Sequence, residues 1–239
     1  VETRLVLSMG PDNSITIRVD LSVPVKGSGP LPAVITGDRE WGRTEGLEVA
    51  TDRGYIVADF YRTDLDPDND DRTNGVHPHY PEYDWATLSV WAWGYYRVVD
   101  YLMTLENVDK DKIVVTGHSR GGKTALLAGA MDSRIAIVVP AGSGAGGCGC
   151  LKYMQGGAES LMRITRSDKW HYWFQPRFSD FRRRVERLPF DQHFLKALVA
   201  PRALLCTEGL EDEWANPWGV SKLLKQRGRF TSSWESRKR

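Results

Sequence analysis

A Gly-x-Ser-x-Gly motif, residues 117–121, stands between a predicted strand and a predicted helix. The β-branched run 113–116 precedes it and the alanine-rich run 124–128 follows it. A serine on such a sharp turn takes a strained backbone conformation, and side chains at the flanking positions would collide with the strand or the helix. The pattern predicts that Ser119 is an activated nucleophile. An ordinary glycine-rich phosphate-binding or packing turn is the alternative.

A serine hydroxyl needs a base, almost always histidine, and an acid that orients this base. In proteins with this motif the acid and then the histidine follow the serine along the chain. Asp212 lies in an acidic loop after an apolar run and is the predicted acid, with Glu208 and Glu211 as alternatives. No histidine follows His193 in the sequence. The chain is therefore a fragment, has an altered C-terminus, uses a non-standard histidine, or is not catalytic.

The five histidines are all expected to have non-catalytic roles. His118 precedes the serine, so its side chain should point away from the nucleophile. His193 opens a helix and is interpreted as a structural residue. His171 lies in an aromatic insertion and is the weak candidate for a replacement base, as is His193. His77 and His79 stand between prolines in a loop, where a surface role is expected.

The spacing of the acidic, cysteine and histidine residues predicts no metal site. The spacing Asp64-x-Asp66-x-Asp68 is similar to the start of a calcium loop, but Asn69 and Gly75 stand where an EF-hand needs glycine and glutamate. A solvated loop is the preferred interpretation. The three cysteines form no disulfide framework, and no spaced Cys/His pairs predict zinc.

The composition suits one α/β domain with a sizeable core over residues 1–239. The chain is 41% hydrophobic and carries 32 Lys+Arg against 31 Asp+Glu, a formal net charge of +1. This balance gives no reason to expect nucleic acid or an anionic membrane as a partner. No apolar run approaches the roughly 18 residues of a membrane span. The chain begins at Val1 without a signal peptide, so a processed or trimmed N-terminus is expected.

Periodicity predicts alternating strands and helices, hence an α/β fold with a mostly parallel sheet. Residues 3–9 and 15–23 alternate as an antiparallel hairpin. Further strands are predicted at 33–36, 55–60, 113–116, 135–139 and 203–207, and helices at 44–52, 84–102, 124–131, 190–199 and from 217. Residues 61–83 form a long loop, residues 151–190 an insertion that covers the sheet, and residues 225–239 a basic tail that is non-native or disordered.

Motifs that occur in a fixed order along residues 31–219 strengthen the functional prediction. One of these motifs is the segment 117–123, which is much more specific than the Gly-x-Ser-x-Gly pattern alone. The others are Trp91-Ala92-Trp93-Gly94, Asp100-Tyr101-Leu102, Ser143-Gly144-Ala145-Gly146-Gly147, Tyr172-Trp173-Phe174, Leu188-Pro189-Phe190-Asp191-Gln192-His193 and Ala200-Pro201-Arg202. With these motifs the chain resembles the glucuronoyl esterases, carbohydrate esterase family 15, and specifically their bacterial branch.

The resemblance implies an α/β-hydrolase fold, a three-layer sandwich, with no cofactor. It implies cleavage of esters between 4-O-methyl-glucuronic acid on xylan and lignin alcohols, in a secreted or periplasmic protein. Ser119 would be the nucleophile, and Arg120 would stabilise the oxyanion. Lys123, Glu159 and Trp214 would contact the sugar.

Two departures from the family pattern bear on the mechanism. Many members carry a glutamate just before Ser143, where this chain has Gly142, so the acid role shifts to Asp212. The family's histidine lies in a C-terminal stretch that this chain lacks, and no residue takes its place in the comparison.

The alternative functions are a promiscuous carboxylesterase on simple or other plant-wall esters, and an impaired fragment that at most binds carbohydrate. An unpaired edge strand would also favour a homodimer.

Overall fold

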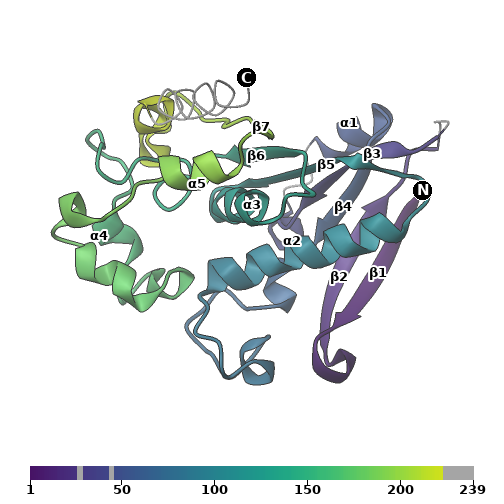
Figure 1. Ribbon diagram of the computed structural model, residues 1–239, viewed down its shortest axis with the longest axis horizontal. Coiled ribbons are helices and arrows are strands. Elements are labelled where there is room, and N and C mark those ends of the chain that lie inside the picture. Colours follow the sequence, from purple (N-terminus) through teal and green to yellow (C-terminus); the bar gives the residue numbers. More distant parts are fainter. Residues whose placement is uncertain (26–28, 43–45, 223–239) are drawn as a thin grey trace, which may run out of the picture.

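The computed structural model describes residues 1–25, 29–42 and 46–222. Its centre is a seven-stranded sheet in the order β1-β2-β4-β3-β5-β6-β7 (Figure 1). The strands are β1 (Glu2–Met9), β2 (Ile15–Ser22), β3 (Leu31–Thr36), β4 (Ile56–Phe60), β5 (Val108–His118), β6 (Ile137–Ala141) and β7 (Ala203–Leu204). Strands β3 to β7 pair in parallel, while β1 pairs with β2 and β2 with β4 in antiparallel fashion. The predicted mostly parallel sheet with an antiparallel start is confirmed.

The N-terminal hairpin turns through a short segment with three residues at positive φ. Gly10, Asp12 and Asn13 have φ values of 76°, 55° and 56°. Asparagine and aspartate tolerate this left-handed region better than other non-glycine residues, so the turn forms at a small conformational cost without three glycines. Beyond the turn, β2 buries Ile15, Ile17 and Val19, so every second side chain of this stretch packs into the core.

Helices cover both faces of the sheet. Helix α1 (Leu47–Asp52) lies on one face, and α2 (Thr87–Thr104), α3 (Arg120–Met131) and α5 (His193–Leu198) lie on the other (Figure 1). This arrangement is the expected three-layer α/β-hydrolase fold. A helix from residue 217 is present up to residue 222, and the predicted tail 225–239 lies outside the described residues.

Helix α2 buries one face whose residues recur at helical spacing. The buried side chains include Leu88, Trp91, Ala92, Tyr95, Val99 and Leu102. Its predicted start at residue 84 was wrong. The helix begins at Thr87, and Ala86 is the N-cap without a side-chain hydrogen bond. Trp85 instead packs against Tyr80 and Trp93, which holds the chain outside the helix.

The buried Tyr95 ties α2 to the ends of two strands. Its hydroxyl donates to the Thr116 carbonyl at 2.8 Å and accepts from the Gly37 amide at 3.1 Å. Thr116 lies on β5 shortly before the sharp turn at Ser119, and Gly37 follows β3. One side chain thus fixes α2 against the carboxyl ends of β3 and β5, where the site is built.

The loop 61–83 separates its three spaced aspartates. Asp64 pairs with Arg18, Asp66 accepts from His77, and Asp68 contacts Arg120. Because each carboxylate serves a different partner, the three do not converge. Throughout the described ranges, no group of three or more His, Cys, Asp or Glu side chains is placed to hold a metal ion.

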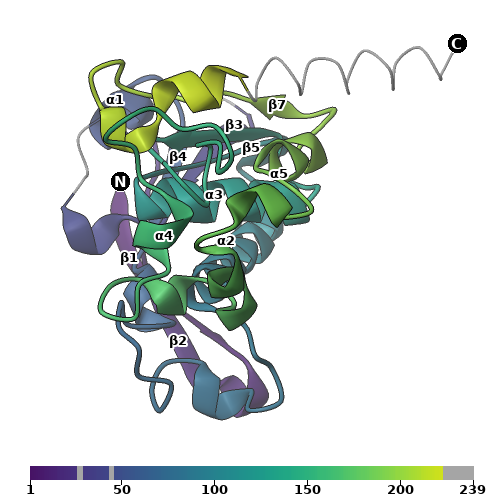
Figure 2. The ribbon, with the colours of Figure 1, turned by 90° about the vertical axis from the view of Figure 1, so that its left-hand side faces the viewer.

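The insertion 151–190 is mostly irregular, with a single turn of helix α4 (Leu161–Ile164). Figures 1 and 2 place this green segment at one end of the molecule, beside α2 and α3. Trp173 from the insertion packs in a buried cluster with Leu88 and Trp91 of α2. Across the parts of the chain that the structure describes, no helix is long and apolar enough to cross a membrane.

Candidate active site

Ser119 occupies a sharp turn between β5 and α3. Its backbone has φ 55° and ψ −118°, a conformation that L-residues rarely adopt. The Ser119 amide donates to the Ala141 carbonyl at 2.9 Å, which ties the turn to β6. A side chain on Gly117 would put its Cβ 2.5 Å from the Gly121 carbonyl oxygen. The glycine at 117 is therefore required by the close approach of α3 to the end of β5.

Asp38, just after β3, holds the turn from the other side. Its Oδ2 accepts from the His118 amide at 2.6 Å, and a Cβ on Gly121 would overlap its carboxylate. The Arg62 guanidinium pairs with Asp38 and donates to the Gly37 carbonyl at 2.6 Å. Both Asp38 and Arg62 are buried. The buried ion pair thus fixes the segment that presents Ser119.

Sequence reasoning missed Asp38 and Arg62. Neither residue was assigned a role from the sequence. The available signal was the position of Asp38 directly after a buried strand, since the carboxyl ends of parallel strands meet at one edge of the sheet. The pairing itself depends on a contact 24 positions apart in the chain, which no local pattern reveals.

Arg120, the first residue of α3, is held by groups from two distant segments. Its Nη1 pairs with Asp68 Oδ2, and its guanidinium carbon lies 5.0 Å from the centre of the Trp173 ring. Asp68 in turn accepts from Trp173 Nε1 at 2.7 Å and from the Tyr172 hydroxyl at 3.1 Å. The loop 61–83 and the insertion thus meet beside the nucleophile and fix the cation there.

Lys123 lies one helical turn after Ser119 and is buried. Its ammonium donates to the Ser143 carbonyl, the Ala145 carbonyl and Glu159 Oε2, each at 2.7 Å. Three partners match the three protons of the ammonium group. Lys123 and Glu159, both named as sugar ligands, therefore form a buried ion pair with each other.

Trp214 is joined to this ion pair by a backbone hydrogen bond to Glu159. Its carbonyl accepts from the Glu159 amide at 2.9 Å, which joins the insertion to the loop after β7. The Trp214 side chain is 42% exposed, and the Arg163 guanidinium lies 5.2 Å from its ring centre. The structure therefore brings Lys123, Glu159 and Trp214 into one connected group.

The acidic loop after β7 offers two carboxyls in different environments. Asp212 is exposed, and its side chain caps a short helical turn by accepting from the Ala215 amide at 3.3 Å. The carboxylate oxygens of Glu208 are buried. Burial, reinforced by the nearby Cys148 thiol, raises the pKa of Glu208 to about 8. Glu211 is exposed.

The histidines are placed as follows. His77 is buried with Nε2 3.1 Å from Asp66, His79 lies 3.0 Å from the Ser14 hydroxyl, and His171 Nε2 lies 2.9 Å from Asp70. His118 is exposed, and its ring lies where a side chain on residue 142 would stand. His193 lines a second cavity of 240 Å³, and partial burial lowers the pKa of its imidazole.

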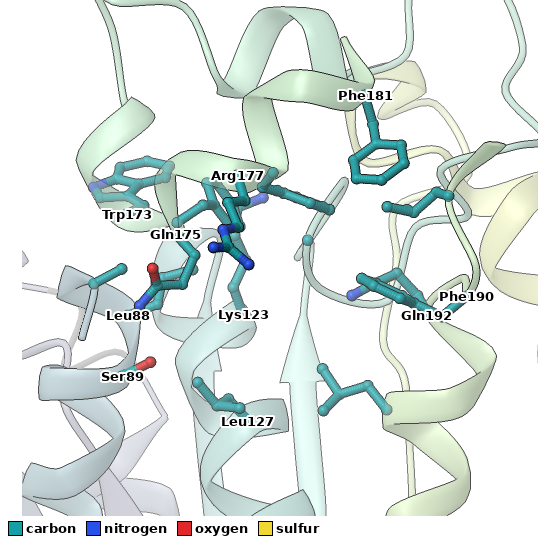
Figure 3. A pocket seen from close by; sticks show the side chains of 16 residues that line it. Leu88, Ser89, Lys123, Leu127, Trp173, Gln175, Arg177, Phe181, Phe190 and Gln192 are labelled. Atoms are coloured by element: carbon teal, nitrogen blue, oxygen red, sulfur yellow. The ribbon is translucent and has the colours of Figure 1, made fainter. Parts of the chain in front are cut away.

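A cavity of 370 Å³ lies between α2, α3 and the insertion (Figure 3). Figure 3 shows Trp173 at the left, Leu127 below, and Phe181 and Phe190 at the right. Its walls include Lys123 and Trp173 but not Ser119, Glu159 or Trp214. It is therefore an apolar neighbour of the nucleophile site, and of the three predicted sugar ligands it includes Lys123 but neither Glu159 nor Trp214.

These observations define the class of protein. A strained serine between a parallel strand and a helix, at the carboxyl edge of a mixed sheet with helices on both faces, is the arrangement of the α/β-hydrolases. A family model described as glucuronyl esterase, fungi, matches residues 8–229. The chain belongs to this glucuronoyl esterase family, carbohydrate esterase family 15, as its motifs predicted.

Individual relatives agree with this assignment. The chain is 39% identical over 181 residues to carbohydrate esterase MZ0003 of an unidentified prokaryote, which covers 72% of this chain and 41% of that protein. It is 34% identical over 211 residues to the 4-O-methyl-glucuronoyl methylesterase of Podospora anserina, covering 84% of this chain and 43% of that protein. The chain thus spans less than half the length of these two curated relatives.

Solved structures show the same fold. The family 15 glucuronoyl esterase from Caldicellulosiruptor kristjansonii matches with a TM-score of 0.86 and 29% identity, over 97% of this chain and 70% of that one. The glucuronoyl esterase catalytic domain from Hypocrea jecorina matches with a TM-score of 0.81 and 28% identity, over 97% and 66% of the two chains. Bacterial and fungal members are therefore both similar to this chain.

Proposed function

We propose that the protein is a serine carboxylic ester hydrolase of glucuronoyl-esterase type. It would cleave esters of glucuronic acid or 4-O-methyl-glucuronic acid in plant cell-wall material. The observation that carries this proposal is the strained Ser119 with Arg120 fixed beside it by Asp68 and Trp173. The relatives named as 4-O-methyl-glucuronoyl methylesterases support the choice of ester.

In the proposed reaction, Ser119 Oγ attacks the ester carbon and its proton passes to a base. The charge that develops on the carbonyl oxygen is stabilised by the Arg120 guanidinium and by the amide groups at the start of α3. The alcohol leaves with a proton, and an acyl-enzyme on Ser119 remains. Water then attacks this acyl group and releases the glucuronic acid product. Asp212 is the proposed catalytic carboxylate that orients the base, and no residue of this chain is assigned as the base.

We propose that Lys123, Glu159 and Trp214 form the sugar side of the site. Lys123 gives its three protons to protein acceptors, so it would orient Glu159 and contribute its charge. Glu159 would accept from sugar hydroxyls, and the half-exposed Trp214 ring offers an apolar face to the sugar. No cofactor enters this scheme.

Hydrolysis of benzyl glucuronate by the 239-residue chain beside Ser119→Ala tests the function. We expect turnover by the native chain that falls by about 10³-fold or more in the variant. Turnover unchanged by the substitution, or none in either protein, contradicts the proposal for this chain. Where turnover is found, replacing His193, His171, His79 and His77 in turn identifies the base.

Two other activities remain as alternative proposals. A promiscuous carboxylesterase would hydrolyse simple or other plant-wall esters as fast as glucuronate esters, and the apolar cavity beside Lys123 favours it. A catalytically impaired fragment would bind a glucuronic acid without turnover. Side-by-side rates on benzyl glucuronate and on a simple acetate ester separate the three.

The expected setting follows from the proposed substrate. A polysaccharide ester of the plant cell wall requires a secreted or periplasmic enzyme, and neither nucleic acid nor a membrane is a proposed partner. Strand β7 is the last strand at one edge of the described sheet. An edge of this kind can pair with another copy, which makes a homodimer the proposed assembly. A monomeric mass by light scattering at tens of micromolar would contradict it.

A further inference from the structure

Two cysteine thiols from different segments meet beneath the edge of the sheet. Cys148 Sγ lies 3.2 Å from Cys206 Sγ. Cys148 belongs to the glycine-rich loop after β6, and Cys206 follows β7. Cys150, two residues after Cys148, has a different partner, since its thiol lies 3.0 Å from Asp191 Oδ2. Sequence spacing alone had given no bridge among these three cysteines.

Backbone hydrogen bonds hold the two segments in a fixed register. The Leu205 amide donates to the Val138 carbonyl at 2.9 Å, and the Thr207 amide donates to the Pro140 carbonyl at 3.1 Å. Cys206 lies between these two anchored residues. On the other segment, the Cys148 amide donates to the Ser143 hydroxyl at 2.8 Å. The sulfur atoms are therefore brought together by ordered backbone on both sides.

We infer that Cys148 and Cys206 are a site of oxidative modification, where a low-molecular-weight disulfide converts the two thiols into an intramolecular disulfide. A covalent S–S bond is about 2.05 Å long, so the sulfur atoms must approach by little more than 1 Å. Side-chain rotation covers such a distance without moving the anchored backbone.

The accessibility of the two sulfurs sets the order of the steps. Cys206 is half-buried and Cys148 is buried. Cys206 loses its proton and attacks the small disulfide, and one small thiolate leaves and takes up a proton. Cys148 then loses its proton and attacks the Cys206 sulfur, and the second small thiolate leaves. Two protein thiols are oxidised, and one small disulfide is reduced to two small thiols.

The charged groups around the pair set its rate. Burial raises the pKa of the Cys148 thiol and so keeps it protonated. The fully buried Lys196 of α5 opposes this effect, because its charge favours the thiolate. Glu208, which follows Cys206 along the chain, is itself near the Cys148 thiol. The second step should therefore be the slow one.

The test starts with the reduced 239-residue chain, incubated with 2-hydroxyethyl disulfide, alkylated with N-ethylmaleimide and digested with trypsin. We expect the peptide 135–152 linked to the peptide 203–222, with Cys150 alkylated. The link should persist in Cys150→Ser, the control for a neighbouring thiol, and vanish in Cys148→Ser and Cys206→Ser. A link through Cys150, or a mixed disulfide on Cys206 that never resolves, overturns the inference.

Thermal unfolding supplies a second readout that does not depend on a variant folding. The bond would close a loop with a sequence separation of 58 residues. A loop of this length predicts that the oxidised native chain unfolds about 8–17 °C above its reduced form. The oxidant should leave the midpoint of Cys206→Ser unchanged. Equal midpoints for oxidised and reduced native protein contradict the assignment.

Discussion

Replacing Lys123 with methionine removes one partner of a buried ion pair and keeps the apolar stem. Lys123 and Glu159 are 3% and 4% exposed in their side chains, and their charged atoms lie 2.7 Å apart. Removal of one partner leaves a buried carboxylate without its cation, which costs about 3–5 kcal/mol in the free energy of unfolding. The Ser143 and Ala145 carbonyls also lose a donor. At roughly 2–4 °C per kcal/mol, Tm should fall by about 6–20 °C.

Urea titration and thermal unfolding of Lys123→Met measure this loss. Lys112→Met is the matched control, because Lys112 pairs with Asp109 at the same 2.7 Å but is 66% exposed. An exposed pair contributes about 0–1 kcal/mol, so the control should lose little. The double variant Lys123→Met/Glu159→Gln should be less destabilised than the sum of its single variants. Equal losses in Lys123→Met and Lys112→Met, or simple additivity in the double variant, would refute the reasoning.

The remaining predictions concern Asp38 and Glu208. Asp38→Asn removes the nearer of two carboxylates that pair with the buried Arg62, because Glu40 Oε1 remains 3.4 Å from its Nε, so urea titration should show a loss of about 1–3 kcal/mol, and no measurable loss would contradict this role. Because the pKa of Glu208 is raised from 4.5 to about 8, the folded state binds its proton more tightly, and stability should decline as pH rises from about 4.5 to 8. Thermal unfolding across this range should show a smaller decline in Glu208→Gln, while buried Asp59, whose pKa is also raised to about 8, preserves part of it. Identical slopes would contradict the assignment to Glu208.

The local sequence was sufficient to predict the nucleophile turn. A β-branched run, a serine between glycines and an alanine-rich run specify strand, sharp turn and helix through short-range sterics. The same kind of information predicted the hairpin, whose alternation is local, and the buried face of α2, whose spacing is helical. The predicted start of α2 at residue 84 was wrong, because Trp85 packs against Tyr80 and Trp93 outside the helix.

The surroundings of the nucleophile depend on contacts that no local pattern encodes. The Asp38 carboxylate holds the turn only because parallel pairing sets the end of β3 beside β5. Lys123 was predicted to contact the sugar, and its burial against Glu159 follows from the way the insertion folds over α3.

What the sequence by itself determined is therefore the chemistry-bearing turn, the order of strands and helices, and the family to which they belong. Each rests on sterics between near neighbours or on ordered motifs. Tertiary structure alone decided the partners of the charged groups. It set Arg120 against Asp68 and Trp173, buried Glu208, and brought Cys148 to Cys206, because these pairs join segments 52 to 58 positions apart or arise from desolvation. Burial and pairing are properties of the packed chain, and they set the charge environment of the site whose nucleophile the sequence predicts.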